Sequence, residues 1–323
     1  MVEAKGLLHI QDLSVTFPSR DGRVAILDRV SFEVPENEIV GLVGESGSGK
    51  TMTSLTVMGF LPPSGQVAGG EIWFKGRDLL RFSEEEMRRV RGQEIAMIFQ
   101  SIRSALNPLM RVGDQVARVY QLQRGLTRQE AYQEAVRILN RMGIPDAERR
   151  ARAYPHQLSR GMCQRVLVAM MVACQPELLI ADEPTTGLDV TIQAQIFELI
   201  KDVQQATGAS ILLITHDLGV IAETCQRVVV MYAGQVMESA SVEPLFAQPC
   251  HPYTQTLLRS ILRVDKVVEI PEADVSLGER VSYSLRGCRF ALRCPVVLPR
   301  CWEEQPPREE AEPDHWVFCH NYG

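Results

Sequence analysis

A glycine-rich segment early in the chain carries the most specific chemistry in the sequence. It lies between a strand-like stretch, IVGLVG, and a helix-like stretch, TMTSLTVMGFL, and it matches the pattern G-x-x-x-x-G-K-[ST] as Gly44-Glu45-Ser46-Gly47-Ser48-Gly49-Lys50-Thr51. Backbone N–H groups at the start of a helix attract phosphate, Lys50 can reach β- and γ-phosphates, and Thr51 can hold Mg²⁺. A purely structural turn is the alternative. The flanking elements favour a nucleotide phosphate site.

Two carboxylates end a later apolar run, which reads LLIADE from Leu178 to Glu183. Open α/β sheets bind their ligands at the carboxyl ends of their strands. Asp182 would hold a water on Mg²⁺, and Glu183 would orient or deprotonate the water that attacks the γ-phosphate. A carboxylate pair that only caps the next helix is the alternative. Together with the phosphate loop, the pair predicts ATP hydrolysis.

A third segment, LSRGMCQR from Leu158 to Arg165, precedes these carboxylates and begins a helix, with Ser159 suited to cap it. It resembles the LSGGQ-type signature of ABC ATPases, in the Met-containing form of peptide-importer subunits. The other motifs follow that family's order: the phosphate loop, the signature, Asp182-Glu183, Gly187-Leu188-Asp189 and His216.

This resemblance assigns roles that the residues alone do not. It implies that Ser159 and Gly161 contact the γ-phosphate of ATP held by a second subunit, and that Asp189 belongs to the D-loop. It also implies that His216 contacts the γ-phosphate and that Phe17 stacks on adenine. Gln100 would be the Q-loop residue, which shares the Mg²⁺ site with Thr51 and Asp182, takes part in catalysis with Glu183 and His216, and links the nucleotide to membrane subunits. A hydrogen-bonded structural role for His216 and a core role for Phe17 are the alternatives.

The sequence His251-Pro252-Tyr253-Thr254, with FQ at Phe99 and LNP at Leu106, resembles the oligopeptide, dipeptide and nickel importer branch. This branch implies an energy-coupling subunit, for di- or oligopeptides or alternatively for nickel or another small solute. ATP would close a head-to-tail dimer and drive two transmembrane permease subunits. The implied partners are a second ABC ATPase subunit, in a heterodimer, and an extracytoplasmic substrate-binding protein. The implied location is peripheral, at the cytoplasmic face of the inner membrane.

Eight cysteines fall into two groups. Four are scattered and are expected to act as small buried hydrophobes: Cys163, Cys174, Cys225 and Cys250. Four crowd the C-terminal end: Cys288, Cys294, Cys301 and Cys319. The second group resembles a motif that binds a [4Fe–4S] cluster, which is the interpretation we favour; Zn²⁺ in a tetrahedral site, or thiols without a ligand, are the alternatives. Since this group is far along the chain from every nucleotide motif, we expect a structural role for it.

Composition and patterning exclude several other functions. The net charge of −6 argues against binding nucleic acid through bulk charge. The N-terminus lacks a cationic leader, and no apolar run is long enough to span a bilayer, so we expect the chain to stay in the cytoplasm. A soluble ABC ATPase acting on DNA, ribosomes or cluster assembly is the alternative function. The single cassette and the short interval between phosphate loop and signature argue against it.

The elements that position these motifs follow from hydrophobic patterning and the resemblance together. LHIQDLSVTF and VSFEV alternate as antiparallel strands do, and residues 101 to 154 are helical in pattern, with a capping box at Thr127 and Glu130. The resemblance implies an α/β fold: a P-loop NTPase of the ABC type, with a RecA-like core, an antiparallel β subdomain and an inserted helical subdomain over about 101–175. We expect this nucleotide-binding domain over residues 1–240 and a small C-terminal extension over 241–323.

The signature departs from the family pattern. Arg160 stands where the first Gly is usual, and Cys163 replaces Arg or Ser. If that position needs a positive φ or close approach to phosphate, Arg160 would strain or block the site. The segment after Gln100 reads SIRSALNP and not the more usual Asp-Pro form, which is a minor departure from the family pattern. We therefore predict that the ATP site completed by this signature turns over slowly.

Overall fold

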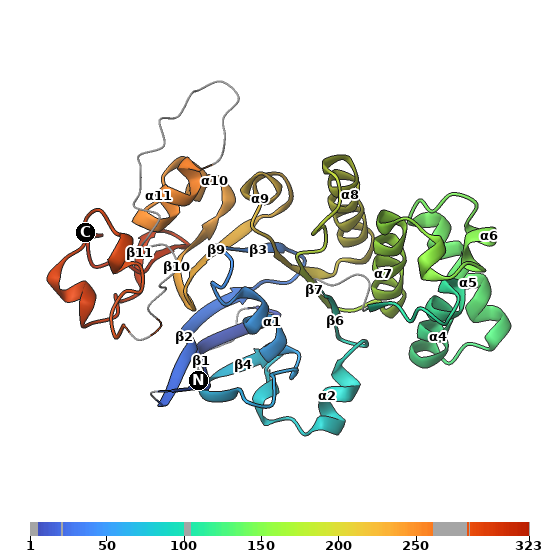
Figure 1. Ribbon diagram of the computed structural model, residues 1–323, viewed down its shortest axis with the longest axis horizontal. Coiled ribbons are helices and arrows are strands. Elements are labelled where there is room, and N and C mark those ends of the chain that lie inside the picture. The colour runs from blue at the N-terminus through green and yellow to red at the C-terminus, as the bar shows by residue number, and fades with distance from the viewer. Residues whose placement is uncertain (1–5, 21, 100–104, 261–282, 284, 323) are drawn as a thin grey trace. The chain divides into compact units, whose positions relative to one another are not determined.

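The computed structural model describes residues 6–20, 22–99, 105–260, 283 and 285–322, and it divides into two compact units (Figure 1). The first comprises residues 1–35, 40–81 and 215–323, and the second comprises residues 36–39 and 82–214. The first unit therefore joins both ends of the chain, while the second is formed almost entirely by its middle.

An antiparallel sheet forms one part of the first unit. Its strand order is β2 (Gly22–Val34), β1 (Leu8–Ser19), β4 (Gln66–Phe74) and β5 (Arg77–Asp78), followed by the short 3₁₀ helix η1 (Leu79–Arg81). Leu8 and Ile10 are fully buried, and after a shift in register so are Leu13 and Val15, because successive side chains of a strand point to opposite faces. The predicted antiparallel pairing of the two N-terminal segments is confirmed.

A second set of strands in this unit pairs in the order β11 (Glu309–Glu312), β12 (His315–Val317), β10 (Gln235–Ser241), β9 (Arg227–Tyr232) and β3 (Ile39–Val43). β3 is parallel to β9, whereas β10 and β12 are antiparallel to their neighbours. The helices of this unit are α1 (Lys50–Val57), α9 (Leu218–Thr224), α10 (Val242–Ala247) and α11 (Pro252–Arg259), with the 3₁₀ turns η4 (Ala291–Arg293) and η5 (Pro299–Trp302). The last residues of the chain thus continue the sheet that contains β3.

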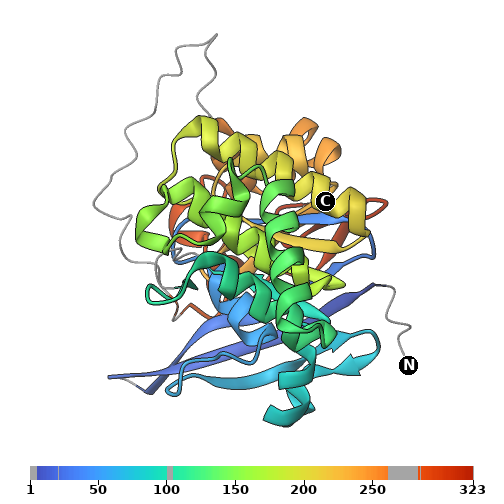
Figure 2. The same cartoon turned by 90° about the vertical axis from the view of Figure 1, so that its right-hand side faces the viewer.

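The second unit contains three parallel strands and a group of helices. The strands β6 (Ile95–Ile98), β7 (Leu178–Asp182) and β8 (Ser210–Ile214) are buried throughout, as the apolar strands of a covered parallel sheet are. The helices are α2 (Glu84–Val90), α4 (Val112–Arg124), α5 (Arg128–Arg141), α6 (Ala147–Ala151), α7 (Arg160–Cys174) and α8 (Val190–Thr207), with the 3₁₀ turn η2 (Pro155–Gln157). α4 packs against α5, α6 and α7, which are the green and yellow-green helices of Figure 2.

Two expectations about helix ends have different outcomes. The capping box at the start of α5 is confirmed, because the Thr127 side chain accepts from the Glu130 N–H and Glu130 reaches back to the Thr127 N–H. The helix after the phosphate loop is shorter than predicted: α1 stops at Val57, and Gly59 follows with φ +65°. Among the residues that the structure describes, none of the helices combines the length and apolar character that a bilayer crossing needs.

Candidate nucleotide site

The phosphate loop begins where β3 ends, and its glycines are required by its backbone. Gly44 has φ +150° and Gly49 has φ +102°, which are conformations that L side chains rarely adopt. A Cβ atom at Gly44 would overlap the carbonyl oxygen of Met231 in β9. The loop therefore lies directly against a neighbouring strand and leads into the N-terminus of α1, where the positive end of the helix dipole favours an anion.

Lys50, the first residue of α1, is turned into this loop. Its side chain is 5% exposed, and Nζ donates to the Gly44 carbonyl at 2.8 Å, the Glu45 carbonyl at 2.9 Å and the Ser48 hydroxyl at 3.1 Å. Thr51 beside it is exposed. The loop thus holds one cation at its centre, next to a hydroxyl that faces outward.

Three side chains from the C-terminal part of the chain bind the same loop. The Tyr253 hydroxyl oxygen accepts from the Glu45 N–H at 3.0 Å, and the Tyr283 hydroxyl donates to the Gly47 carbonyl at 2.5 Å. Arg293 donates to both Glu45 carboxylate oxygens, at 2.8 and 3.0 Å. The cysteine-rich segment is far along the chain from the nucleotide motifs, yet it reaches the phosphate loop in space, since Arg293 directly precedes Cys294. Tyr253 stood in a quoted motif, but no sequence signal identified Tyr283 or Arg293.

Asp182 and Glu183 lie in the second unit, at the carboxyl end of β7. Asp182 is 1% exposed, and Glu183 has φ +44°, a left-handed conformation that a non-glycine residue adopts only when its surroundings enforce it. The Glu183 N–H donates to the Ile214 carbonyl at 2.9 Å, and the Thr186 hydroxyl donates to the Glu183 carboxylate at 2.9 Å. The strained turn and the hydroxyl together fix where the Glu183 carboxylate lies.

The signature residues begin α7 in the same unit. Ser159 caps the helix, as predicted, by accepting from the Met162 N–H. Arg160 is the first helical residue and its φ is not positive, so the backbone strain expected of an arginine at this position is absent. Its guanidinium instead lies against the α-carbon of Gly187, where no side chain is in the way. Asp189 caps α8 by accepting from the Ile192 N–H at 3.0 Å.

The remaining predicted nucleotide residues are divided among the parts of the chain. His216 is exposed and Phe17 is half-buried, and both belong to the first unit with the phosphate loop. The Phe17 ring lies against Gly65, where an added Cβ would come within 2.7 Å of Cζ. Gln100 lies outside the described residues. Gly161 of the second unit faces Ile192, which leaves little room for a side chain there.

The C-terminal cysteines lie near one another in the first unit. Cys288, Cys301 and Cys319 are buried and Cys294 is half-buried, and the Cys288 N–H donates to the Cys301 carbonyl at 2.8 Å. Burial, with a smaller contribution from negative charge on the other three, raises the pKa of the Cys288 thiol to about 12. Of the scattered cysteines, Cys163 and Cys225 are buried as predicted, whereas Cys174 and Cys250 are only half-buried.

A different group of metal-competent side chains was not foreseen from the sequence. Within the described ranges, the set of Glu238, Cys250 and His315 is the one whose ligand atoms all lie within 4.8 Å of one another. The Glu238 carboxylate pairs with His315 Nε2 at 2.7 Å and accepts from the backbone N–H groups of Cys250 and His251 at 2.8 and 2.9 Å. These hydrogen bonds satisfy the buried carboxylate and account for the group without an ion.

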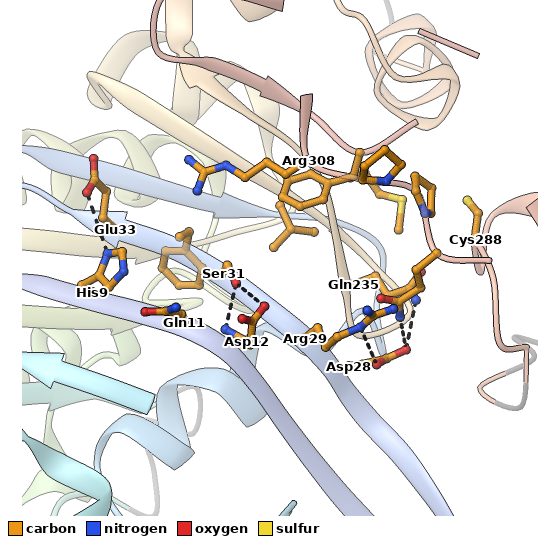
Figure 3. Close-up of a pocket in the computed structure, with 17 residues that line it drawn as sticks. His9, Gln11, Asp12, Asp28, Arg29, Ser31, Glu33, Gln235, Cys288 and Arg308 are labelled. Carbon is orange, nitrogen blue, oxygen red and sulfur yellow. Dashed lines mark hydrogen bonds and ion pairs between the residues drawn. The ribbon is translucent and has the colours of Figure 1, made fainter. Parts of the chain in front are cut away.

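A cavity of about 490 Å³ lies beside the cysteine segment, between β1, β2, β10 and the C-terminal residues (Figure 3). Asp28, Gln235, Cys288 and Arg308 are among its lining residues, and Gln235 donates to Asp28 at 3.1 Å. Of the predicted nucleotide residues that the structure describes, none lines this cavity. The cavity is therefore distinct from the phosphate loop.

Comparison with known proteins covers nearly the whole chain. A family profile described as ABC transporter matches residues 27–186, and one described as the C-terminal region of oligopeptide/dipeptide transporters matches residues 237–301. A probable peptide ABC transporter ATP-binding protein of Sinorhizobium fredii is 48% identical, over 97% of this chain and 94% of its own. The dipeptide transport ATP-binding protein DppD of Escherichia coli is 43% identical, over 97% and 96%. A solved dimeric bacterial ABC transporter cassette has a TM-score of 0.65 at 26% identity, covering 73% of this chain and 98% of its own.

Proposed function

Since this chain belongs to the ABC transporter ATP-binding proteins, in their oligopeptide and dipeptide branch, we propose that it hydrolyses ATP to drive the import of di- or oligopeptides. The observation that carries this function is the phosphate loop itself. Its glycines bring the backbone to the N-terminus of α1, and Lys50 is already held inside it by three oxygen atoms. Such a site is built for a phosphate chain.

The residues of the chain divide the chemistry between binding and activation. The loop N–H groups and Lys50 bind the β- and γ-phosphates, and Phe17 stacks on adenine. Glu183 accepts the proton of the attacking water, and His216 contacts the γ-phosphate, which leaves as inorganic phosphate. The hydroxyl of Thr51 and the carboxylate of Asp182 are hard oxygen donors that suit Mg²⁺, with Gln100 as a further donor. Mg²⁺, when bound, neutralises charge on the phosphates.

Coupling to transport requires further subunits. We propose that Ser159, Gly161 and Asp189 complete the ATP site of a second ABC ATPase in a heterodimer, and that closure of the dimer drives two permease subunits supplied by a substrate-binding protein. This places the chain at the cytoplasmic face of the inner membrane. The dimeric form of the similar solved cassette supports the pairing. We propose the same domain division as before, residues 1–240 and 241–323, and the match of a C-terminal family region over 237–301 supports it.

The test of this function is to purify the tagged full-length chain from solubilised membranes and identify the proteins that accompany it. We expect a second ABC ATPase and two permease subunits, and ATP hydrolysis that rises when a peptide-loaded binding protein is added to the reconstituted complex. Recovery with ribosomal or DNA-repair proteins in place of permeases would reject a transport function.

The two ATP sites of such a heterodimer should differ. Arg160 puts a bulky cation beside Ser159, in the signature that faces the partner's phosphate loop, while Glu183 and Lys50 serve the other site. A misplaced donor to the γ-phosphate costs about 3 kcal/mol, or about a hundredfold in rate. We expect Glu183→Gln to remove most ATPase activity of the complex and the matching change in the partner to remove little. Equal losses, or no gain at the second site with Arg160→Gly, would contradict this asymmetry.

We also propose that Cys288, Cys294, Cys301 and Cys319 hold a [4Fe–4S] cluster. The four cysteines lie near one another, and since burial raises the pKa of Cys288, a cation beside its thiolate would stabilise it, as the iron of a cluster does. We expect protein purified without oxygen to be brown and to carry iron and sulfide, and Cys294→Ser to bleach it, whereas Cys163→Ser should not. A colourless protein with one equivalent of zinc would replace this proposal by a zinc site.

A further inference from the structure

Side chains of the C-terminal segment hold the phosphate loop from outside every nucleotide motif. We propose that Tyr253, Tyr283 and Arg293 are positioning residues for ATP, which set the conformation of the loop that binds its phosphates. The C-terminal segment is on this proposal a working part of the nucleotide site. The contacts that these three residues make with the loop all lie within the first unit, and they do not require the cysteines to carry a metal.

Glu45 is the residue through which the loop is held. Tyr253 accepts from its N–H, Ser48 and Lys50 donate to its carbonyl, and Arg293 binds its carboxylate at both oxygens. A bidentate arginine–carboxylate pair fixes orientation as well as distance. The backbone and the side chain of Glu45 are thus both restrained, so its peptide groups have little freedom to turn.

The groups that restrain Glu45 are themselves fixed. The Arg293 guanidinium lies over the rings of Tyr232 and Phe290, at 5.6 and 5.8 Å from their centroids. Tyr253 is fully buried, and its ring packs against the same two rings at 4.7 and 5.3 Å. An arginine held by aromatic faces forms its ion pair with less loss of side-chain entropy. Tyr253 and Arg293 are therefore held in place before nucleotide binds.

The tip of the loop is held in the same way. The Ser48 N–H donates to the Glu45 carbonyl at 3.1 Å and closes a tight turn, and the Tyr283 hydroxyl holds the Gly47 carbonyl on the other side of that peptide. Because the N–H and C=O of a trans peptide point in opposite directions, this unit cannot flip without breaking both bonds. The turn is fixed at the position where phosphate approaches.

A second series of hydrogen bonds connects the cysteine segment to the phosphate loop. Arg289, which follows Cys288, is buried and donates to the Ala233 carbonyl, and the adjacent Gly234 N–H donates to the Ser48 carbonyl at 2.8 Å. Arg289 also reaches the Tyr283 carbonyl at 3.4 Å. Arg289 and Arg293, each next to one of the C-terminal cysteines, thus connect the cysteine segment to the phosphate loop. On this proposal, a displacement of the cysteine segment changes the affinity for nucleotide.

The test measures ATP binding to the full-length chain with a fluorescent ATP analogue, alongside the KM and kcat of hydrolysis. We expect Arg293→Ala to weaken binding about tenfold, as loss of a charge-assisted pair does, and to raise KM more than it lowers kcat. Arg293→Lys should recover part of the affinity because it keeps the charge without the bidentate geometry. Tyr253→Phe should weaken binding by about threefold, by removing one neutral acceptor.

The matched control is Arg308→Ala. Arg308 belongs to the same segment, but its guanidinium lies over the Trp316 ring, 3.8 Å from the centroid, so its loss should leave ATP affinity unchanged. Far-UV circular dichroism and the urea midpoint report whether each variant is folded. If Arg293→Ala does not fold, the ATP affinity of Tyr253→Phe tests the proposal instead. A folded Arg293→Ala or Tyr253→Phe with unchanged affinity, or an equal loss in Arg308→Ala, overturns the proposal. Failure of the unsubstituted chain to bind ATP would instead refute the proposed function.

Discussion

Acidification should destabilise the protein through one buried histidine, His251. Its side chain is 1% exposed, and Nδ1 accepts from the Tyr253 N–H at 3.0 Å, which caps α11. Burial lowers the pKa of His251 to about 4, and the Glu238 carboxylate opposes the shift only in part. A proton on Nδ1 would remove the acceptor and leave a charge in the core. Tyr253, which binds the phosphate loop, lies in the first turn of α11 and is held directly by this cap.

The direction and size of the effect follow from proton linkage. An unfolded chain takes up a proton on this histidine near pH 6.5, but the folded chain does so only near pH 4. The folded state therefore binds fewer protons between these values, and the contribution to stability, complete above pH 6.5, is lost progressively as the pH falls towards 4. The loss in the free energy of unfolding is about 2 kcal/mol from about pH 7 to about pH 5.

The assay is urea denaturation followed by circular dichroism across this pH range, with the unsubstituted protein and His251→Asn. Asparagine keeps an acceptor for the Tyr253 N–H and has no titrating group, so the variant should lose about 2 kcal/mol less on acidification. His156→Asn, at an exposed histidine, should behave like the unsubstituted protein. If His251→Asn shows the same pH dependence as the unsubstituted protein, the reasoning about His251 is wrong.

Three further substitutions test the nucleotide site. Lys50→Ala should abolish tight nucleotide binding, because it removes the cation that the loop holds at its centre; a fluorescent ATP analogue measures this, and unchanged affinity would remove the loop from its role. Glu183→Gln should leave ATP bound but block hydrolysis, since the shape is kept and the base is lost; phosphate release measures turnover, and a normal rate would exclude Glu183 as the base. Gly44→Ala should lower the free energy of unfolding by about 3 kcal/mol, because its Cβ would overlap the Met231 carbonyl at φ +150°. Gly69→Ala is its control, with nothing within 4 Å of the added atom, and an equal loss in both would refute the steric argument.

Local patterns predicted the parts of the structure that local forces determine. Alternating residues identified β1, the apolar run identified β7, and Thr127 with Glu130 marked the start of α5. Each depends on residues a few positions apart. The phosphate loop was recognised for the same reason, since its glycines and Lys50 lie within one short segment.

What the sequence did not predict depends on contacts between distant segments. Arg293 is separated from Glu45 by 248 positions, and no periodicity or spacing connects them. Arg160 would strain the backbone if its position needed a positive φ, but it is helical there, and its guanidinium lies over Gly187, a contact that no local pattern indicates. The early end of α1 was marked by Gly59, whose left-handed conformation was not taken into account.

The pairing of β12 with β10 has a consequence for how the protein is made. Glu238 and Ser239 of β10 pair with Val317 and Trp316, which are made much later in synthesis. Until those residues leave the ribosome, the outer edge of β10 has no partner, and the Glu238 carboxylate lacks His315. An unpaired strand edge is a template for association with other chains. A chain released before residues 315–317 are made therefore contains every nucleotide motif but leaves this edge of β10 open to association with other chains.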